Sequence, residues 1–344
     1  MGQDEPPRQR RVRYKGTHPR RFEEKYKELA PERHAAELEK VKARGQTPAG
    51  THRSICVAEI LEVLAPKPGE SGLDATLGYG GHAQELLPRL LPGGRLVGLD
   101  VDPLELPRTE TRLRSLGFGE DALAVRRMNF AGLPRVQAEF GRFDLVLADL
   151  GVSSMQIDNP ARGFSWKADG PLDLRLNPQR GRPAAALLAA LEEQALADLL
   201  VENSDEPHAA AIAREVHGRD IRTTRDLAER VKAALRVEGL EDEDIKRALQ
   251  RTFQALRIAV NDELTVLDQF LSLLPGVLNP GGRVAILTFH SGEDRRVKKA
   301  FQQGLREGTY AAVAPEPLRA SPEERWSNPR ATSAKLRWAR LPPG

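Results

Sequence analysis

The stretch LDATLGYGGHAQELLPRLLPGGRLVGLDVD, residues 73–102, decides the fold. Residues 73–77 have the pattern of a short buried strand, the glycines of GYGG supply a turn, and residues 83–91 have helical periodicity. A second apolar strand, residues 95–99, ends at Asp100. A doubly wound nucleotide-binding sheet carries at this place the carboxylate that binds the ribose hydroxyls. The stretch therefore predicts a strand–turn–helix–strand unit with a candidate adenosine pocket.

The glycine turn is of a kind that does not have to hold a phosphate. A dinucleotide site usually has GxGxxG, whereas GYGGHA lacks the third spaced glycine. The turn is closer to that of S-adenosylmethionine sites, where glycines without Cβ atoms let a methionyl ribose pass the backbone. The alternative is an ordinary turn without a ligand, and Asp100 argues against it.

Length and composition indicate a cytoplasmic protein that has no contact with membranes. The 344 residues suffice for two domains or one domain with an insertion, and 40% hydrophobic with 29% charged residues is ordinary for a soluble chain. Cys56 is the single cysteine, which excludes an internal disulfide and fits a reducing compartment. The sequence has no run of 18 apolar residues and no apolar N-terminal signal.

Both ends of the chain are basic, although the net charge is only +3. Residues 1–53 contain 14 Lys and Arg against 8 Asp and Glu, and residues 283–344 contain 12 against 6. The segment between them contains 26 against 35. Basic ends are typical of arms that contact nucleic-acid phosphates, and solvated termini are the alternative.

The βαβ pattern continues to Asp149. We expect a helix at residues 103–116 and a strand at residues 122–126, followed by Phe130. Loops after strand ends form the ligand crevice of such a sheet, so Phe130 is placed to cover a purine, unless it is an ordinary core residue. The apolar strand 143–148 then brings Asp149 to the same edge.

A helical insertion interrupts the sheet for about a hundred residues after Met155. The expected helices there are 184–201, 209–216, 224–235 and 242–253. The sheet resumes with a helix at 255–274 and a strand at 283–289, which leads to His290. This divides the chain into a basic N-terminal extension (1–50), a sheet domain (51–154 and 255–344) and an inserted helical domain (155–254).

Seven ordered blocks resemble a known family: DATLGYGGHA, LDVDP, ADLGVSSMQID, RGFSWKADGPLDLRL, ALRIAVNDEL, TFHSGEDRRVK and NPRATSAKLR. They are similar to the signature blocks of the bacterial small-subunit (16S) rRNA cytosine-N4 methyltransferases, the MraW type. The resemblance implies an α/β fold, with a Rossmann-like methyltransferase sheet and an inserted substrate domain. It also implies S-adenosylmethionine as methyl donor and a cytidine of the decoding centre as acceptor. The first 50 residues have no counterpart in the usual family member.

The resemblance also implies which residues bind the cofactor. Gly80, Gly81 and His82 would line its methionine end, Asp100 would bind the ribose, and Phe130 would pack near the adenine. Asp149 and Gln156 would complete the set. Reasoning from the residues alone agrees for Asp100 and the glycines, leaves His82 open as a simple helix start, and is silent on Gln156.

The expected chemistry needs an acceptor beside the reacting amine. The amino nitrogen of cytosine is a poor nucleophile because its lone pair is delocalised into the ring, so the enzyme must orient the group by hydrogen bonds. Asp149 is the first candidate for that role. His290 is the second, as a proton acceptor, with a structural cap of the next helix as the alternative.

The acceptor base must leave its stack to reach this edge, so an aromatic platform and basic residues are expected nearby. Phe164 and Trp166 with Arg162 and Arg175 are candidates, and the alternative for the aromatics is that they wedge the insertion onto the sheet. Further candidates for the basic residues are Arg295, Arg296, Lys298 and Lys299. The expected partner is ribosomal RNA or the small ribosomal subunit, and a homodimer stays open. Two rival functions are a non-catalytic rRNA-binding assembly factor and a methyltransferase of another acceptor.

Overall fold

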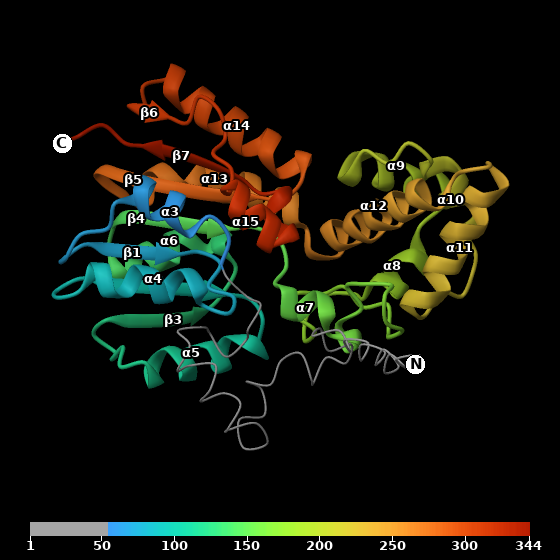
Figure 1. Ribbon diagram of the computed structural model, residues 1–344, viewed down its shortest axis with the longest axis horizontal. Coiled ribbons are helices and arrows are strands. Elements are labelled where there is room, and N and C mark those ends of the chain that lie inside the picture. Colours follow the sequence, from blue (N-terminus) through green and yellow to red (C-terminus); the bar gives the residue numbers. More distant parts are fainter. Residues whose placement is uncertain (1–53) are drawn as a thin grey trace, which may run out of the picture. The chain divides into compact units, whose positions relative to one another are not determined.

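The computed structural model describes residues 54–344, and the predictions made for residues 1–53 lie outside the described part. A seven-stranded sheet with the order β3-β2-β1-β4-β5-β7-β6 organises this part (Figure 1). Its strands are β1 (Ser71–Asp74), β2 (Arg95–Asp100), β3 (Leu123–Arg127), β4 (Phe143–Asp149), β5 (Leu278–Thr288), β6 (Ala312–Val313) and β7 (Lys335–Arg340). The predicted strands before Asp100 and Asp149 are confirmed.

The first five strands are parallel, and β7 runs antiparallel to both β5 and β6. Strand order reverses between β1 and β4, since the chain first builds outward through β2 and β3 and then returns to the other side of β1. In an open parallel sheet such a switch point, at the carboxyl ends of the strands, is where ligands bind. The α/β, Rossmann-like fold predicted from the sequence is confirmed.

Alternating side chains of β4 point to the two faces of the sheet. Leu145 and Leu147 belong to one buried cluster with the helices before β3, whereas Val146 and Ala148 belong to another with later helices. Because both faces are covered, residues 145–148 of the strand are all apolar instead of alternating with polar residues.

The helices that cover the sheet fall into two groups (Figure 1). One face is covered by α3 (Val57–Leu64), α4 (Gly81–Leu90) and α5 (Glu105–Ser115). The other face is covered by α6 (Leu133–Phe140), α13 (Glu263–Val277) and α14 (Ser291–Arg306). The chain also forms short helical elements: η2 (Phe130–Gly132), α7 (Ser154–Asp158), η3 (Pro160–Arg162), α15 (Pro322–Ser327) and η4 (Pro329–Thr332).

Five helices between β4 and α13 pack around a hydrophobic core of their own, which extends from Phe164 to Leu256. They are α8 (Ala184–Ala190), α9 (Glu193–Ser204), α10 (Ala209–Val216), α11 (Thr224–Val237) and α12 (Asp242–Asn261). Helix α9 packs on α10 and α12, and α11 packs on α10 and α12. The insertion is therefore a helical cluster with its own interior.

The structure moves three element boundaries that were predicted from sequence. The expected helix 184–201 is two helices, because the chain is extended at Leu191 and Glu192. The expected break near residue 254 lies instead at Asp262, which adopts a left-handed conformation between α12 and α13. Strand β5 begins at Leu278, five residues before the expected start at Arg283, so it includes Pro280, Gly281 and Gly282.

No helix between residues 54 and 344 is both long and apolar enough to cross a membrane.

Candidate active site

Three carboxylates stand at the carboxyl ends of neighbouring strands. Asp74 ends β1, Asp100 ends β2 and Asp149 ends β4. These strands are parallel and adjacent, so the three side chains share one edge of the sheet on both sides of the switch point. The sequence predicted Asp100 and Asp149 at this edge, and it missed Asp74.

The glycine turn packs closely against its surroundings. Gly80 has φ +73°, and a Cβ there would lie 2.9 Å from the Thr109 methyl group. A Cβ on Gly81 would lie 2.0 Å from the Ser54 hydroxyl. Larger residues would displace the turn at both positions, so the sequence needs glycine here for the path of the backbone.

Asp100 is held against this turn. One carboxylate oxygen accepts the Gly78 N–H at 2.8 Å, and the other accepts the Asp102 N–H at 2.9 Å. Burial raises the pKa of Asp100 above its usual value, while these backbone donors act in the opposite direction. An oriented carboxylate beside a glycine turn fits a ribose, because carboxylate oxygens accept hydrogen bonds from two neighbouring hydroxyls.

His82 joins the start of α4 to the end of β4. Its Nε2 lies 3.0 Å from the Ile55 carbonyl oxygen, and its Nδ1 lies 3.6 Å from a carboxylate oxygen of Asp149. Burial lowers the pKa of His82, although the Ile55 carbonyl and the nearby Asp74 favour the charged ring. The imidazole is therefore neutral at pH 7, with its proton on the nitrogen that faces the carbonyl.

Asp149 is anchored through its backbone and open at its side chain. Its N–H donates to the Thr76 hydroxyl at 2.6 Å, and 30% of its side chain is exposed, which leaves a carboxylate oxygen within reach of a ligand. Burial, followed by the negative charge of Glu293, raises the pKa of Asp149 to about 7. Such a group accepts a hydrogen bond or a proton near neutral pH.

Asp74 is the buried support of this arrangement. It is 2% exposed, and its carboxylate accepts the N–H of Thr76, the residue that bonds Asp149. Burial raises the pKa of Asp74 to about 7, opposed by His82 and by Thr76. Its only signal in the sequence was an acid inside the predicted strand 73–77, two residues before a threonine; in the structure the strand ends at Asp74.

Phe130 lies in η2 at the same edge and is half-buried. Its ring packs edge-on against Phe270 of α13, with 5.1 Å between the ring centres. Phe130 therefore makes the core contact that was expected from the sequence as the alternative to a purine contact. Part of Phe130 remains exposed.

His290 lies between β5 and α14. It precedes the first residue of α14, yet its side chain makes no capping hydrogen bond. Its Nε2 lies 3.2 Å from a carboxylate oxygen of Glu293, whose other oxygen accepts the Phe289 N–H. Burial would raise the pKa of Glu293, but the contacts with His290, the charge of Arg257 and the Phe289 N–H together lower it. Glu293 was missed from the sequence as a neighbour of His290.

Gln156 is held inside the protein by two hydrogen bonds. Its amide oxygen accepts the Ser153 N–H at 2.9 Å, which completes a capping box at the start of α7. Its amide nitrogen donates to Asp102 at 2.8 Å. Gln156 therefore lies beside the loop that follows Asp100, although a surface position would be usual for a lone polar residue.

The residues expected to contact RNA in the 158–177 segment are largely packed inward. Arg162 is 5% exposed and pairs with Asp102, so the prediction that it belongs to a basic surface is wrong. Phe164 is 8% exposed within the helical core, and Trp166 packs on Phe253 with 5.4 Å between the rings. Arg175 is paired with Asp173. Both aromatics pack inside the helical insertion, so they form neither an exposed RNA platform nor a wedge between the insertion and the sheet. Trp326 of α15, in contrast, is 88% exposed and was not predicted.

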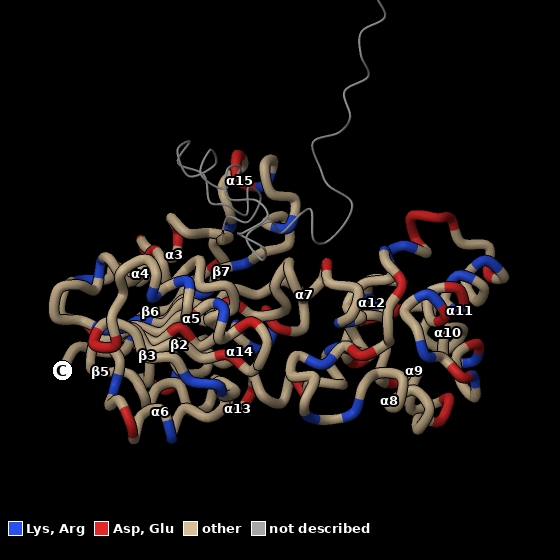
Figure 2. The backbone as a smooth tube through the Cα atoms, turned by 90° about the horizontal axis from the view of Figure 1, so that it is seen from below, with Lys and Arg blue, Asp and Glu red and all other residues tan. Residues whose placement is uncertain are grey.

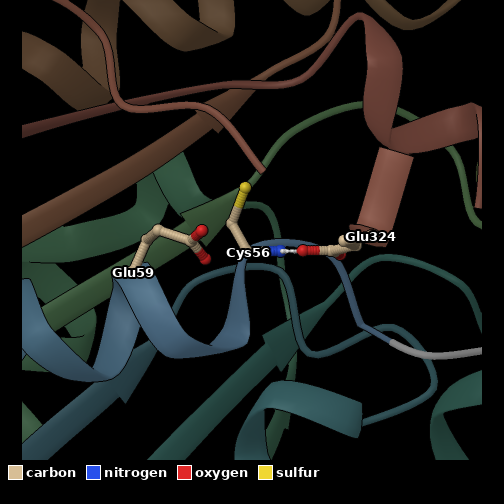
Figure 3. A group of neighbouring side chains, drawn as sticks. All are labelled: Cys56, Glu59 and Glu324. Carbon is tan, nitrogen blue, oxygen red and sulfur yellow. Dashed lines mark hydrogen bonds between the residues drawn. The ribbon is translucent and has the colours of Figure 1, made fainter. Parts of the chain in front are cut away.

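One group outside the edge brings together side chains that can bind a metal. Figure 3 shows Cys56 between Glu59 and Glu324, with the Cys56 N–H donating to the Glu324 carboxylate at 3.1 Å. Burial, and then the charges of Glu59 and Glu324, raise the pKa of Cys56 to about 12. The thiol is therefore protonated at neutral pH without a metal, and a metal ion would have to displace this proton in order to bind.

The strand order with its antiparallel β7, together with the glycine turn and the carboxylates at the switch point, defines a Rossmann-like methyltransferase. The chain belongs to the MraW methylase family, whose sequence profile matches residues 49–341. The family and the fold together imply S-adenosylmethionine as the methyl donor.

Relatives extend over nearly the whole chain. The "Ribosomal RNA small subunit methyltransferase H 2" of Alkaliphilus metalliredigens is 56% identical over 98% of this chain and 99% of its own length. The "Ribosomal RNA small subunit methyltransferase H" of Synechococcus sp. (strain WH7803) is 45% identical over 84% of this chain and 94% of its own length. Among solved structures, a putative rRNA-methylase from Clostridium thermocellum is similar with a TM-score of 0.41 and 11% identity, over 85% of this chain and 99% of that one.

These matches refine the expectation about the N-terminal extension. A match over 98% of 344 residues leaves about seven residues unmatched, so most of the first 50 residues have counterparts in the Alkaliphilus relative. The Synechococcus relative spans less of the chain, as expected for a member without the extension. The extension is therefore shared by some relatives and is not peculiar to this chain.

Proposed function

We propose that this protein transfers a methyl group from S-adenosylmethionine to the N4 amino group of a cytidine in small-subunit (16S) ribosomal RNA, near the decoding centre. The observation that carries the proposal is the position of Asp149, a partly exposed carboxylate across the switch point from the ribose-type carboxylate of Asp100. The names of the full-length relatives, which are small-subunit rRNA methyltransferases, support small-subunit ribosomal RNA as the substrate. Such an acceptor would place the protein in the cytoplasm.

The cofactor would lie along the edge formed by the glycine turn and the end of β2. Gly80 and Gly81 would line the methionine end with their backbone, with His82 beside it, and Asp100 would bind the ribose hydroxyls. Phe130 would pack near the adenine with the part of its ring that Phe270 leaves open. The set is completed by Asp149 and Gln156. The bound cofactor supplies an electrophilic methyl group on a sulfonium.

Asp149 would orient the acceptor. Its carboxylate accepts a hydrogen bond from the cytosine amino group, which favours the geometry in which the nitrogen lone pair points at the methyl group. After transfer, the nitrogen carries one proton too many. Asp149, with its pKa raised to about 7, accepts that proton near neutral pH, and His290 is the second candidate for the same step.

We propose that the helical insertion, approximately residues 155–254, recognises the RNA, with residues 51–154 and 255–344 forming the methyltransferase domain. Figure 2 shows that Lys and Arg on α10 and α11 are interspersed with Asp and Glu, and several are paired, such as Arg230 with Glu215. This favours recognition of RNA shape by the insertion. The stronger phosphate attraction is expected from the basic segment before residue 54.

Mass spectrometry of rRNA nucleosides from cells that lack this protein tests the proposal. N4-methylcytidine at one position of the small-subunit RNA should disappear and should return with the wild-type gene, but not with an Asp149→Asn gene. Unchanged N4-methylcytidine would overturn the proposed acceptor. A ribosome assembly defect that the Asp149→Asn gene corrects would favour the rival non-catalytic role.

A further inference from the structure

Three buried polar side chains meet directly behind the proposed ribose site. Asp102 follows β2 and is fully buried, Gln156 of α7 is 9% exposed, and Arg162 at the end of η3 is 5% exposed. One carboxylate oxygen of Asp102 accepts from Gln156 at 2.8 Å and from Arg162 at 2.6 Å. Buried charges are costly unless they are paired, so the three groups depend on one another.

Asp102 connects this cluster to Asp100, the carboxylate assigned to the ribose. The second carboxylate oxygen of Asp102 accepts the N–H groups of Leu104 and Glu105, at 2.9 and 3.3 Å, at the start of α5. The backbone N–H of Asp102 donates to Asp100 at 2.9 Å. The orientation of Asp100 is therefore tied to a residue whose own side chain is fixed by Arg162.

On the insertion side, Arg162 holds the end of the 158–177 segment. Its other terminal nitrogen donates to the carbonyl oxygens of Arg175 and Leu176, at 3.0 and 2.8 Å. Asn261, the last residue of α12, accepts the Leu176 N–H and donates to the Leu174 carbonyl, both at 2.8 Å. A single guanidinium thus joins the loop after β2 to the segment that leads into the helical insertion.

We propose that Arg162 is a positioning residue that makes cofactor binding and the order of the 172–176 backbone depend on each other. The proposal rests on the assignment of Asp100 to the ribose. A ribose on Asp100 fixes the loop that carries Asp102, and Arg162 transmits this constraint to the carbonyls of Arg175 and Leu176. Without the guanidinium, the Asp102 carboxylate is buried and unpaired, and the loop must rearrange to hydrate it.

Arg162→Lys tests this proposal, with Arg283→Lys as the matched control. Lysine keeps the positive charge, but its ammonium group lacks the planar arrangement of donors with which the guanidinium bonds a carboxylate and two carbonyls at once. Arg283 is a half-buried arginine that likewise bonds one carboxylate, Glu70, and several carbonyls, those of Leu64, Ala65 and Asp144, but Glu70 and Asp144 lie at the amino ends of β1 and β4. Both variants should lower Tm, whereas only Arg162→Lys should weaken S-adenosylmethionine binding, by about tenfold in calorimetry without RNA.

If both variants lose stability and bind S-adenosylmethionine within twofold of the wild type, Arg162 only stabilises the fold and the proposal is wrong. Because this measurement contains no RNA, its result does not depend on the identity of the acceptor. An Asp100→Ala protein with normal cofactor affinity would instead overturn the ribose assignment itself.

Hydrogen exchange of the wild-type protein gives a second test that no folding defect can obscure. S-adenosylhomocysteine should slow exchange of the Leu174 and Leu176 amides, which bond to Arg162 and Asn261, as well as amides in residues 78–82 and 100–105. Slower exchange confined to the last two segments would show that the cofactor does not order the 172–176 backbone, which contradicts the proposal.

Discussion

The Nδ1 atom of His82 lies 3.6 Å from the Asp149 carboxylate, and the opposite nitrogen of the ring faces the Ile55 carbonyl. Because the carbonyl can only accept, the proton of the neutral ring lies on Nε2 and the lone pair of Nδ1 faces Asp149. The Nδ1 lone pair of His82 repels the negative charge of an ionised Asp149 and therefore favours the protonated carboxyl. Burial acts in the same direction and raises the pKa of Asp149 to about 7. The site thus provides an acid whose proton is exchangeable near neutral pH.

Asp149→Asn should separate catalysis from binding. The substitution keeps the shape of the side chain but replaces one acceptor oxygen with a donor, so methyl transfer should fall by about a hundredfold or more. Cofactor affinity should fall much less. Single-turnover rates and calorimetry measure the two effects. If they fall in parallel, Asp149 is only a cofactor ligand and His290 becomes the residue to test.

The pH dependence of turnover gives an independent check of Asp149. The carboxylate is a better acceptor when ionised, so kcat should rise as the pH passes through about 7 and then level off. The Asp149→Asn enzyme should lack this rise in its residual activity. An identical profile in both enzymes would assign the titration to another group.

Asp100→Ala should weaken S-adenosylmethionine binding by roughly ten- to a hundredfold, because it removes charge-assisted hydrogen bonds to the ribose that are worth about 1.5 to 3 kcal/mol. Asp100→Asn is the matched control, since it keeps an oxygen that can accept the Gly78 N–H. It should lose less affinity than the alanine variant. Equal affinity of wild-type and Asp100→Ala proteins in calorimetry would contradict the ribose role.

Asp74 should make the protein less stable as the pH rises. Burial raises its pKa from 3.8 to about 7, so between these values the folded protein binds a proton that the unfolded chain has lost. Its contribution to the free energy of unfolding is therefore largest below about pH 4 and declines up to about pH 7. Asp74→Asn should stabilise the protein by about 2 to 4 kcal/mol at pH 8 and by less at pH 5. Denaturant unfolding that gives the same difference at both pH values would contradict this.

The basic N-terminal segment should contribute RNA affinity that depends on salt. Residues 8–21 contain seven Lys and Arg and no acid. Deleting residues 1–22 should weaken RNA binding and reduce the slope of log affinity against log salt by up to about 5, if each charge contacts a phosphate of single-stranded RNA. Titrations at several salt concentrations measure this slope, and an unchanged slope would mean that the segment does not contact RNA.

Local patterns were sufficient to predict the positions of Asp100 and Asp149. Each follows four residues without a polar side chain, residues 96–99 and 145–148, and parallel strands bring their carboxyl ends to one edge of the sheet. The glycine turn was predictable for a similar reason, since the need for glycine arises within a few residues. These features depend on short-range geometry that the sequence displays directly.

Contacts between distant segments were not predictable in this way. Arg162 pairs with Asp102, 60 residues earlier, and nothing in the sequence near Arg162 distinguishes a buried arginine from one on a surface. The break between α12 and α13 lies at Asp262, a left-handed residue without a glycine or proline to mark it. The expected roles of Gln156 and His290 likewise depended on the family resemblance or on residues that only the fold brings near.

Methyl transfer by the purified protein tests the central claim most directly. The protein is incubated with labelled S-adenosylmethionine and small ribosomal subunits from a strain that lacks it, and the RNA is digested and analysed by mass spectrometry. The proposed function predicts label in N4-methylcytidine at a single position near the decoding centre, and no label with the Asp149→Asn protein. Label in another nucleoside, or no transfer to RNA by a wild-type protein that binds S-adenosylmethionine, would contradict it.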